Sequence, residues 1–224
     1  MLNAGEEYFD MLAYDTKVLP AQTDNHILWC CHAEALDDLG RYEDAVKAYR
    51  EALKIKSDYK DAWIGLGAVL CDKLQDYEGA NTCFEKALRI NYLDDFAWYN
   101  RGNVLENLER YEDALACYNI VLKLNPGDEN AWYSRGWLLY EMGDLQEAIA
   151  SFDQSLKFKP HDDSTWYNKA CCHAVLGDVN QACECLQQAI QLSPNQYRHL
   201  AKTEADFDKI RDHARFRELI NPVR

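Results

Sequence analysis

The nine cysteines and six histidines are the residues of this 224-residue chain that are best suited to metal or redox chemistry. Two groups stand out, Cys171-Cys172-His173 and Cys183-X-Cys185. Structural zinc sites use cysteine pairs separated by two residues or more, and neither group has that gap. A buried cysteine otherwise behaves as a small apolar side chain. We therefore expect no metal site and no cofactor.

The same residues do not form a catalytic group. His32 and His173 adjoin cysteines in sequence, but neighbours on a helix point about 100° apart and cannot act as a nucleophile and its base. The chain also has no glycine-rich loop that could hold a phosphate. We therefore expect a protein that is not an enzyme. A redox-sensing thiol, at Cys30, Cys71 or Cys171, remains as an alternative.

Charge and hydropathy restrict the partners. The formal net charge is −14, whereas binding to nucleic acid needs a basic surface. No stretch approaches the roughly 20 apolar residues of a membrane span, so we expect no membrane insertion. The start of the chain lacks the basic residues and the apolar run of a secretory signal. Together with an odd number of cysteines, this predicts a cytoplasmic, reducing environment.

A repeating pattern must position any functional residue. Tryptophan recurs at spacings of 34, 35, 34 and 34 residues, and a glycine or alanine follows four residues after each one. An alanine recurs in the second half of each unit, and a large residue follows it four positions on. The five tryptophans are Trp29, Trp63, Trp98, Trp132 and Trp166. Self-similarity at a fixed period of this length indicates a repeat architecture.

Each unit is predicted to be two helices joined by a tight turn. Gly40, Gly143 and Gly177 stand where the first helix must end, and glycine readily adopts the positive φ that such an ending needs. Prolines are expected to end the second helix at Pro126, Pro160 and Pro194. Small residues in the glycine and alanine columns let the two helices approach closely.

The pattern resembles the tetratricopeptide repeat family, in which Trp, Gly or Ala, Tyr or Leu, Ala, Phe or Tyr, Ala and Pro recur in a frame of 34 residues. This resemblance implies an all-α fold, a right-handed α-solenoid of five helix-turn-helix repeats with helical caps. The repeats are expected at residues 26–59, 60–94, 95–128, 129–162 and 163–196.

The two ends depart from this frame. Residues 1–25 contain one expected helix, which we interpret as an amino-terminal cap or half repeat. Residues 197–224 are expected to form carboxy-terminal capping helices, because a terminal repeat has no neighbour to cover its exposed face. Their Asp-Phe-Asp…Arg-Phe pattern is similar to the endings of many bacterial proteins of this type, cyanobacterial ones among them.

The resemblance also implies a binding surface. When Trp is numbered 4 in each repeat, positions 2, 5, 9, 12 and 13 share one face of the first helix, away from the core face. In the family this face lines a concave groove that binds peptides. We therefore expect a partner-binding groove that includes Phe96, Tyr99, Asn103, Glu106, Asn130, Tyr133, Trp137, Tyr140, Tyr167, Asp37 and Asp72.

The composition of this face suggests the character of the partner. Seven of its 25 positions are acidic and none is basic, and its aromatic residues concentrate in repeats three to five. Acidic and aromatic side chains together suit a basic or amphipathic segment of another protein. The alternative is that the tyrosines only pack and the charges only face solvent. The carboxylate clamp, which in this family holds acidic chaperone tails, needs lysine and arginine in the groove and is therefore not expected.

Two other functions remain open. The chain could be a structural scaffold or an assembly factor for a multiprotein complex, such as a photosynthetic or membrane complex, which uses its convex face or caps. It could also self-associate through its terminal helices. Residues 195–224 carry 7 basic and 5 acidic side chains, so this end could meet the acidic body of a second copy.

Overall fold

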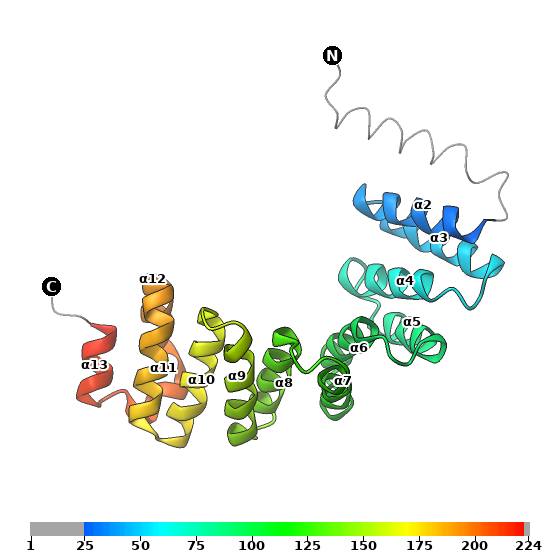
Figure 1. Ribbon diagram of the computed structural model, residues 1–224. Helices are drawn as coiled ribbons and strands as arrows, with labels where there is room; N and C mark the ends of the chain where they lie inside the picture. The colour runs from blue at the N-terminus through cyan, green and yellow to red at the C-terminus, as the bar shows by residue number, and fades with distance from the viewer. Residues whose placement is uncertain (1–24, 222–224) are drawn as a thin grey trace, which may run out of the picture. The chain divides into compact units, whose positions relative to one another are not determined.

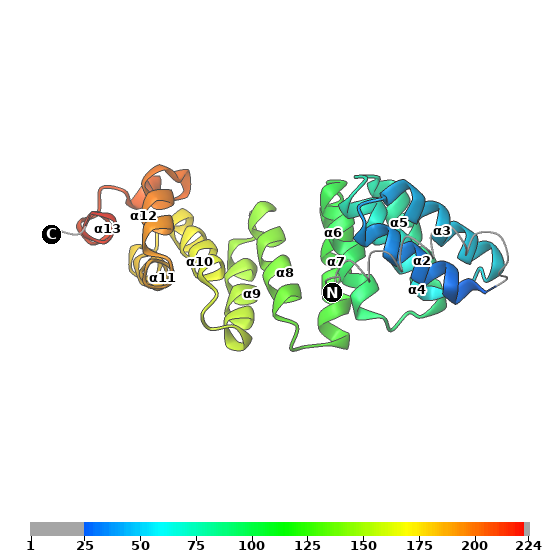
Figure 2. The ribbon, with the colours of Figure 1, turned by 90° about the horizontal axis from the view of Figure 1, so that it is seen from above.

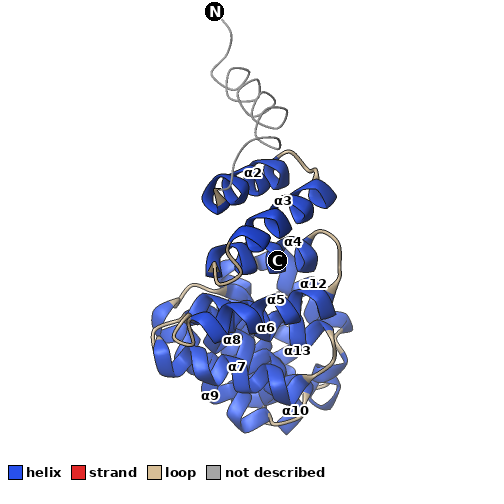
Figure 3. Ribbon diagram, turned by 90° about the vertical axis from the view of Figure 1, so that its right-hand side faces the viewer, coloured by secondary structure: helices blue, strands red, loops and turns tan. Residues whose placement is uncertain are grey.

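The computed structural model describes residues 25–221 and divides into two compact units, Met1–Cys117 and Tyr118–Arg224. Each unit is helical, and no strand occurs among the described residues (Figure 3). The prediction of an all-α repeat fold is confirmed. The amino-terminal cap expected for residues 1–25 lies outside the described part of the chain, Asn25 excepted.

The first unit contains two complete helix pairs and the start of a third. Its helices are α2 (His26–Asp38), α3 (Tyr42–Ile55), α4 (Lys60–Asp72), α5 (Tyr77–Ile90) and α6 (Asp95–Asn107). Within each pair α2 packs on α3 and α4 on α5, and the second helix of each pair packs on the first helix of the next (Figure 1). Helix α7 (Tyr111–Leu124) crosses the boundary into the second unit.

The second unit continues the same arrangement. Helices α8 (Glu129–Glu141), α9 (Leu145–Phe158), α10 (Asp163–Leu176) and α11 (Val179–Leu192) pack in chain order (Figure 2). The consecutive helix pairs predicted from the sequence are therefore present in both units.

Three short helices follow the last pair. They are α12 (Pro194–Thr203), the 3-10 helix η2 (Ala205–Ile210) and α13 (Ala214–Ile220). Helices α12 and α13 both pack on α11, while η2 packs on α10. Phe207 and Phe216 are fully buried among them, with ring centroids 5.3 Å apart. This end of the chain therefore adds its own apolar side chains to the core of the second unit.

Small residues set the distance between paired helices. A Cβ atom on Gly136 of α8 would lie 2.7 Å from a ring carbon of Phe152 on α9, which is too close for any larger residue. Phe152 is itself fully buried. The glycine and aromatic columns of the sequence are thus two sides of the same contact.

The recurring tryptophans secure the loops that join the repeats. In four repeats the indole Nε1 donates a hydrogen bond to a backbone carbonyl six residues earlier. The pairs are Trp63 with Ser57 at 2.9 Å, Trp98 with Tyr92 at 2.8 Å, Trp132 with Pro126 at 2.9 Å, and Trp166 with Pro160 at 2.9 Å. The tryptophan column therefore ties the loop that precedes each of these helices to the helix itself.

Aspartates begin many of these helices. Asp94, Asp128 and Asp162 each accept a hydrogen bond from the backbone N–H three residues later, at 2.8 to 3.0 Å. Such caps satisfy N–H groups that lack a partner within the helix. Within residues 25–221, no helix combines the length and the apolar character that a membrane span needs.

Candidate functional site

Three helices of the second unit enclose a pocket of about 380 Å³. Helix α8 contributes Tyr133 and Trp137, helix α10 contributes residues from its first turns, and α12 closes the far side. The full lining consists of Tyr133, Trp137, Ser164, Tyr167, Asn168, Gln196, Tyr197 and Leu200. Three of these, Tyr133, Trp137 and Tyr167, belong to the groove set predicted from the sequence.

The open wall of this pocket is aromatic. Tyr133 and Trp137 are four residues apart and therefore project from the same face of α8. Trp137 is 38% exposed, and its ring lies 5.5 Å from that of Tyr140. Tyr133 packs against Phe152, with ring centroids 6.0 Å apart. The indole is thus held by its neighbours while much of its surface stays available to a ligand.

Neutral polar groups lie beside this wall. Asn168 donates a hydrogen bond from Nδ2 to the Tyr133 hydroxyl at 3.1 Å, which orients both side chains. A carboxamide has two donor hydrogens and an acceptor oxygen, so Asn168 can still bind a peptide group. Among the described residues, no charged side chain lines the pocket. The pocket therefore suits an apolar side chain whose backbone forms hydrogen bonds.

The carboxy-terminal segment covers two other members of the predicted set. Tyr167 is only 7% exposed, and its ring lies 4.9 Å from Tyr197 and 5.8 Å from Phe207. The Tyr140 hydroxyl donates a hydrogen bond to the carboxylate of Asp206 on η2. Burial, followed by this hydrogen bond, raises the pKa of Tyr140. Tyr167 therefore forms a floor, and Tyr140 is joined to the cap instead of facing an open groove.

The other predicted positions on α6 and α8 do not line this pocket. Phe96 on α6 is 60% exposed, whereas Tyr99, Asn103 and Glu106 on the same helix are half-buried. Asn130 is exposed in the first turn of α8. The four α6 residues belong to the first unit and form no part of the pocket in the second.

The predicted acidic residues of repeats one and two also belong to the first unit. Burial raises the pKa of Glu34, and the negative charges of Asp38 and Asp61 raise it further, which shows that carboxylates crowd on α2 and α4. Asp37 is half-buried and Asp72 is exposed. The acidic residues Asp37 and Asp72 therefore lie in a different unit from the aromatic pocket of α8, α10 and α12.

The cysteines have the character of core residues. Burial is the main cause that raises the pKa of Cys30 to about 12 and that of Cys71 to about 11, and it also raises the pKa of Cys171. The thiolate is the reactive form of cysteine, so these shifts disfavour a redox-sensing thiol at the three candidate positions. Within the described residues, no group of three or more potential metal ligands comes together.

Sequence reasoning missed the part of the pocket that α12 supplies. Gln196 is the last residue of the fifth predicted repeat, and Tyr197 and Leu200 lie beyond it, so the 34-residue frame assigns none of them to the groove. The available signal is the apolar helical set that begins at Leu200 and Ala201, which by itself predicts only a cap. The cap is also a wall of the pocket.

Comparisons with known proteins agree with the repeat pattern. Family models described as "Tetratricopeptide repeat" match residues 72–129, 99–163 and 164–196, and one described as "TPR repeat" matches residues 33–73. No curated protein matches the chain.

Several solved structures share the fold. The chain is 29% identical to YrrB, which is described as a TPR protein with an unusual peptide-binding site; the match covers 84% of this chain and 97% of YrrB, with a TM-score of 0.73. MamA is 18% identical, with 80% and 95% of the two chains covered and a TM-score of 0.72. MamA from Desulfovibrio magneticus RS-1 is 22% identical, with 79% and 99% covered and a TM-score of 0.72. At these last two identities the similarity establishes the fold alone.

Proposed function

The chain belongs to the tetratricopeptide repeat family, and we propose that it is a non-enzymatic adaptor that binds a basic or amphipathic segment of a partner protein. Members of this family are in general protein-interaction modules. In this proposal an apolar side chain of the segment enters the pocket between α8, α10 and α12. As a separate contact, basic side chains of the partner bind the acidic residues of α2 and α4 in the first unit.

The observation that carries the proposal is the half-exposed indole of Trp137, which lies in the same pocket as the carboxamide of Asn168. Tryptophan and tyrosine dominate the energetics of protein interfaces because they bury a large area at a small entropic cost. Trp137 and Tyr133 form such a wall, and Asn168 lies beside them in the same pocket. YrrB, the 29% identical structure, is described as having a peptide-binding site, which supports a peptide as the ligand.

The charge of the first repeats supports the basic character of the segment. The raised pKa of Glu34 reflects repulsion from Asp38 and Asp61 in addition to burial. A lysine or arginine placed near these carboxylates would relieve the repulsion and would also favour association at low salt. An acidic segment would increase it.

The test is affinity capture from an extract of the native cells, with the wild-type chain and Trp137→Ala in parallel. Once a captured partner is identified, its binding segment is measured as a labelled peptide. We expect Trp137→Ala to cost about 2 kcal/mol, or roughly thirtyfold in affinity. Phe158→Ala is the matched control, because Phe158 on α9 is an exposed aromatic residue of the same unit that does not line the pocket.

The dependence of binding on salt distinguishes the apolar contact in the pocket from the contact between basic and acidic side chains. Binding that weakens as salt rises supports the contact between basic and acidic side chains, because exposed charges are screened at high ionic strength. A partner that Trp137→Ala retains at wild-type affinity would overturn the groove proposal and would favour the scaffold alternative.

A further inference from the structure

A second set of clefts lies where the second helix of one repeat meets the next pair. In three of these junctions, a cation on the first helix pairs with a side chain 16 residues earlier. Arg101 pairs with Glu85 at 2.8 Å, Arg135 with Asn119 at 2.9 Å, and Lys169 with Asp153 at 2.6 Å. Each of these three junctions therefore contains a cation with a polar partner.

The junction between the first two repeats has the opposite arrangement. Leu66 replaces the cation, and Arg50 stands at the position 16 residues earlier, where the other junctions have an acid or an amide. Arg50 is exposed and forms no hydrogen bond or ion pair with any other residue that the structure describes. Compared with the other three junctions, this one has an unpaired cation on the second helix and lacks the partly buried cation on the first helix of the next pair.

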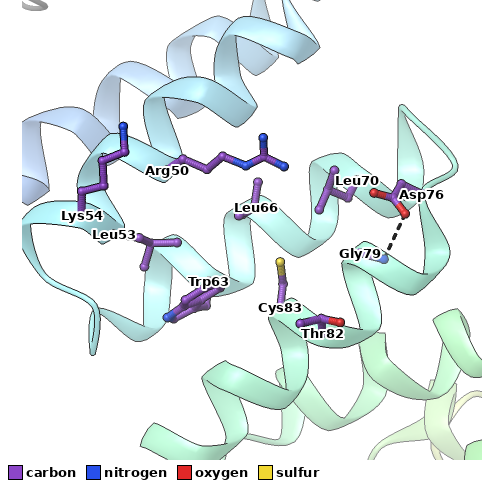
Figure 4. A pocket seen from close by; sticks show the side chains of 10 residues that line it. All are labelled: Arg50, Leu53, Lys54, Trp63, Leu66, Leu70, Asp76, Gly79, Thr82 and Cys83. Carbon is purple, nitrogen blue, oxygen red and sulfur yellow. Dashed lines mark hydrogen bonds between the residues drawn. The ribbon is translucent and has the colours of Figure 1, made fainter.

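This junction contains a pocket of about 510 Å³ between α3, α4 and α5 (Figure 4). Its interior is apolar, and Arg50 reaches from α3 into the same space in the close-up view. Cys83 in this pocket has a pKa of about 12, raised by burial, with the charge of Arg50 acting in the opposite direction. The residues that make its apolar surface are Leu53, Trp63, Leu66, Leu70 and Cys83.

An exposed loop of the same unit carries apolar side chains where the equivalent loops of the other repeats do not. Leu93 occupies a column that otherwise holds only polar residues and glycine, and it is 68% exposed. Phe96, three residues later, is 60% exposed, and Asp95 lies between them. The other members of the Leu93 column are Asp58, Gly127, His161 and Asn195.

Hydrogen bonds hold this loop in one conformation. The backbone N–H of Leu93 donates to the Asn91 side chain at 3.1 Å, and the Trp98 indole donates to the carbonyl of Tyr92 at 2.8 Å. Asp94 pairs with Lys60 at 2.6 Å. Asp95, in contrast, forms no ion pair with a described residue. A loop that is already ordered loses little entropy when it binds.

We propose that the pocket between α3 and α5 receives the Leu93 loop of a second copy of this chain, with Asp95 of that copy pairing with Arg50. In this contact the Leu93 side chain packs into the apolar pocket, and the unpaired carboxylate of Asp95 forms an ion pair with the unpaired guanidinium of Arg50. A second copy is the favoured occupant because both complementary halves lie on this one chain. The contact is head-to-tail, so each copy donates one loop and accepts another, and association can continue beyond a dimer.

The test is sedimentation equilibrium of the full chain from about 1 to about 500 μM, a range that suits the weak affinity of small interfaces. We expect an average mass that rises with concentration and passes the dimer. Arg50→Glu and Asp95→Lys should each weaken association about tenfold or more, because each places like charges together. The double variant Arg50→Glu/Asp95→Lys should restore it to within about threefold, because the pair is re-formed with its charges exchanged.

Controls keep the test decisive. Lys202→Glu makes the same charge change as Arg50→Glu, but on α12 in the second unit, and should leave association unchanged. Leu93→Asn should weaken association without altering charge, and thermal melting checks that each variant is folded.

A chain that stays monomeric throughout would overturn the proposal and leave the pocket to another occupant. Association that survives Arg50→Glu, or that the double variant fails to restore, would also overturn it.

Discussion

At the scale of single residues, the turn between paired helices explains an irregularity of the sequence. Five equivalent positions end the first helices, and all five have a positive φ; three are glycines, but Gln75 has φ 55° and Glu109 has φ 57°. A side chain in this left-handed region costs about 1–2 kcal/mol. Gln75→Gly and Glu109→Gly should therefore each stabilise the chain by about 0.5–1 kcal/mol in urea unfolding.

The control separates the backbone from the side chain. Gln75→Ala removes the same polar group but keeps the Cβ atom that conflicts with a positive φ, so it should give no stabilisation. If alanine and glycine stabilised the chain equally, the gain would come from loss of the side chain and this explanation would be wrong.

At the scale of elements, the contact between Gly136 and Phe152 sets the spacing of α8 and α9. Gly136→Val would place its Cβ atom 2.7 Å from the Phe152 ring and force the helices apart. Overpacking of this kind costs about 1–3 kcal/mol, so the free energy of unfolding should fall by that amount. Phe152→Leu added to Gly136→Val should recover part of the loss, because the smaller side chain makes room. Additive losses from the two substitutions would show that these residues do not share one contact.

The elements were predictable because their pattern repeats. The five tryptophans of one repeat column, with the glycines at 40, 143 and 177, were enough to predict helix pairs and the turns between them. Gln75 and Glu109 could not be assigned to the same turn position from their side chains, which carry no preference for positive φ. A helical wheel also shows only which residues share a face, so it could not reveal that the indole of Trp132 donates to the loop before its own helix.

The site was predictable only in part, for a related reason. Tyr133, Trp137 and Tyr167 share a repeat column or face, and the structure brings them to one pocket. Tyr140 was expected in an open groove, but its partner Asp206 lies 66 residues further along the chain. Such contacts are formed by the cap, where the repeat pattern ends and periodicity carries no information.

At the scale of the whole molecule, the net charge of −14 opposes folding. Glu34 belongs to the crowded carboxylates on α2 and α4, and its folded pKa is raised above its ordinary value of 4.5 by burial and by Asp38 and Asp61. Well below pH 4.5 the group is protonated in both the folded and unfolded states and has no effect on stability. As pH rises through the folded pKa, the carboxylate ionises where ionisation is unfavourable, and stability is lost.

Glu34→Gln should therefore raise the urea midpoint at pH 7, and the gain should vanish at about pH 4. The gain should also shrink as salt rises from about 0.01 M to 0.15 M, where the Debye length falls from about 30 Å to about 8 Å. Glu51→Gln is the matched control, since Glu51 lies 2.5 Å from Lys54 and its loss removes an attraction while changing the net charge equally. Because repeats transmit stability through their nearest neighbours, relief at α2 and α4 should shift the unfolding of the array. An equal rise in both variants would show that net charge alone, and not the crowding around Glu34, limits the stability of the chain.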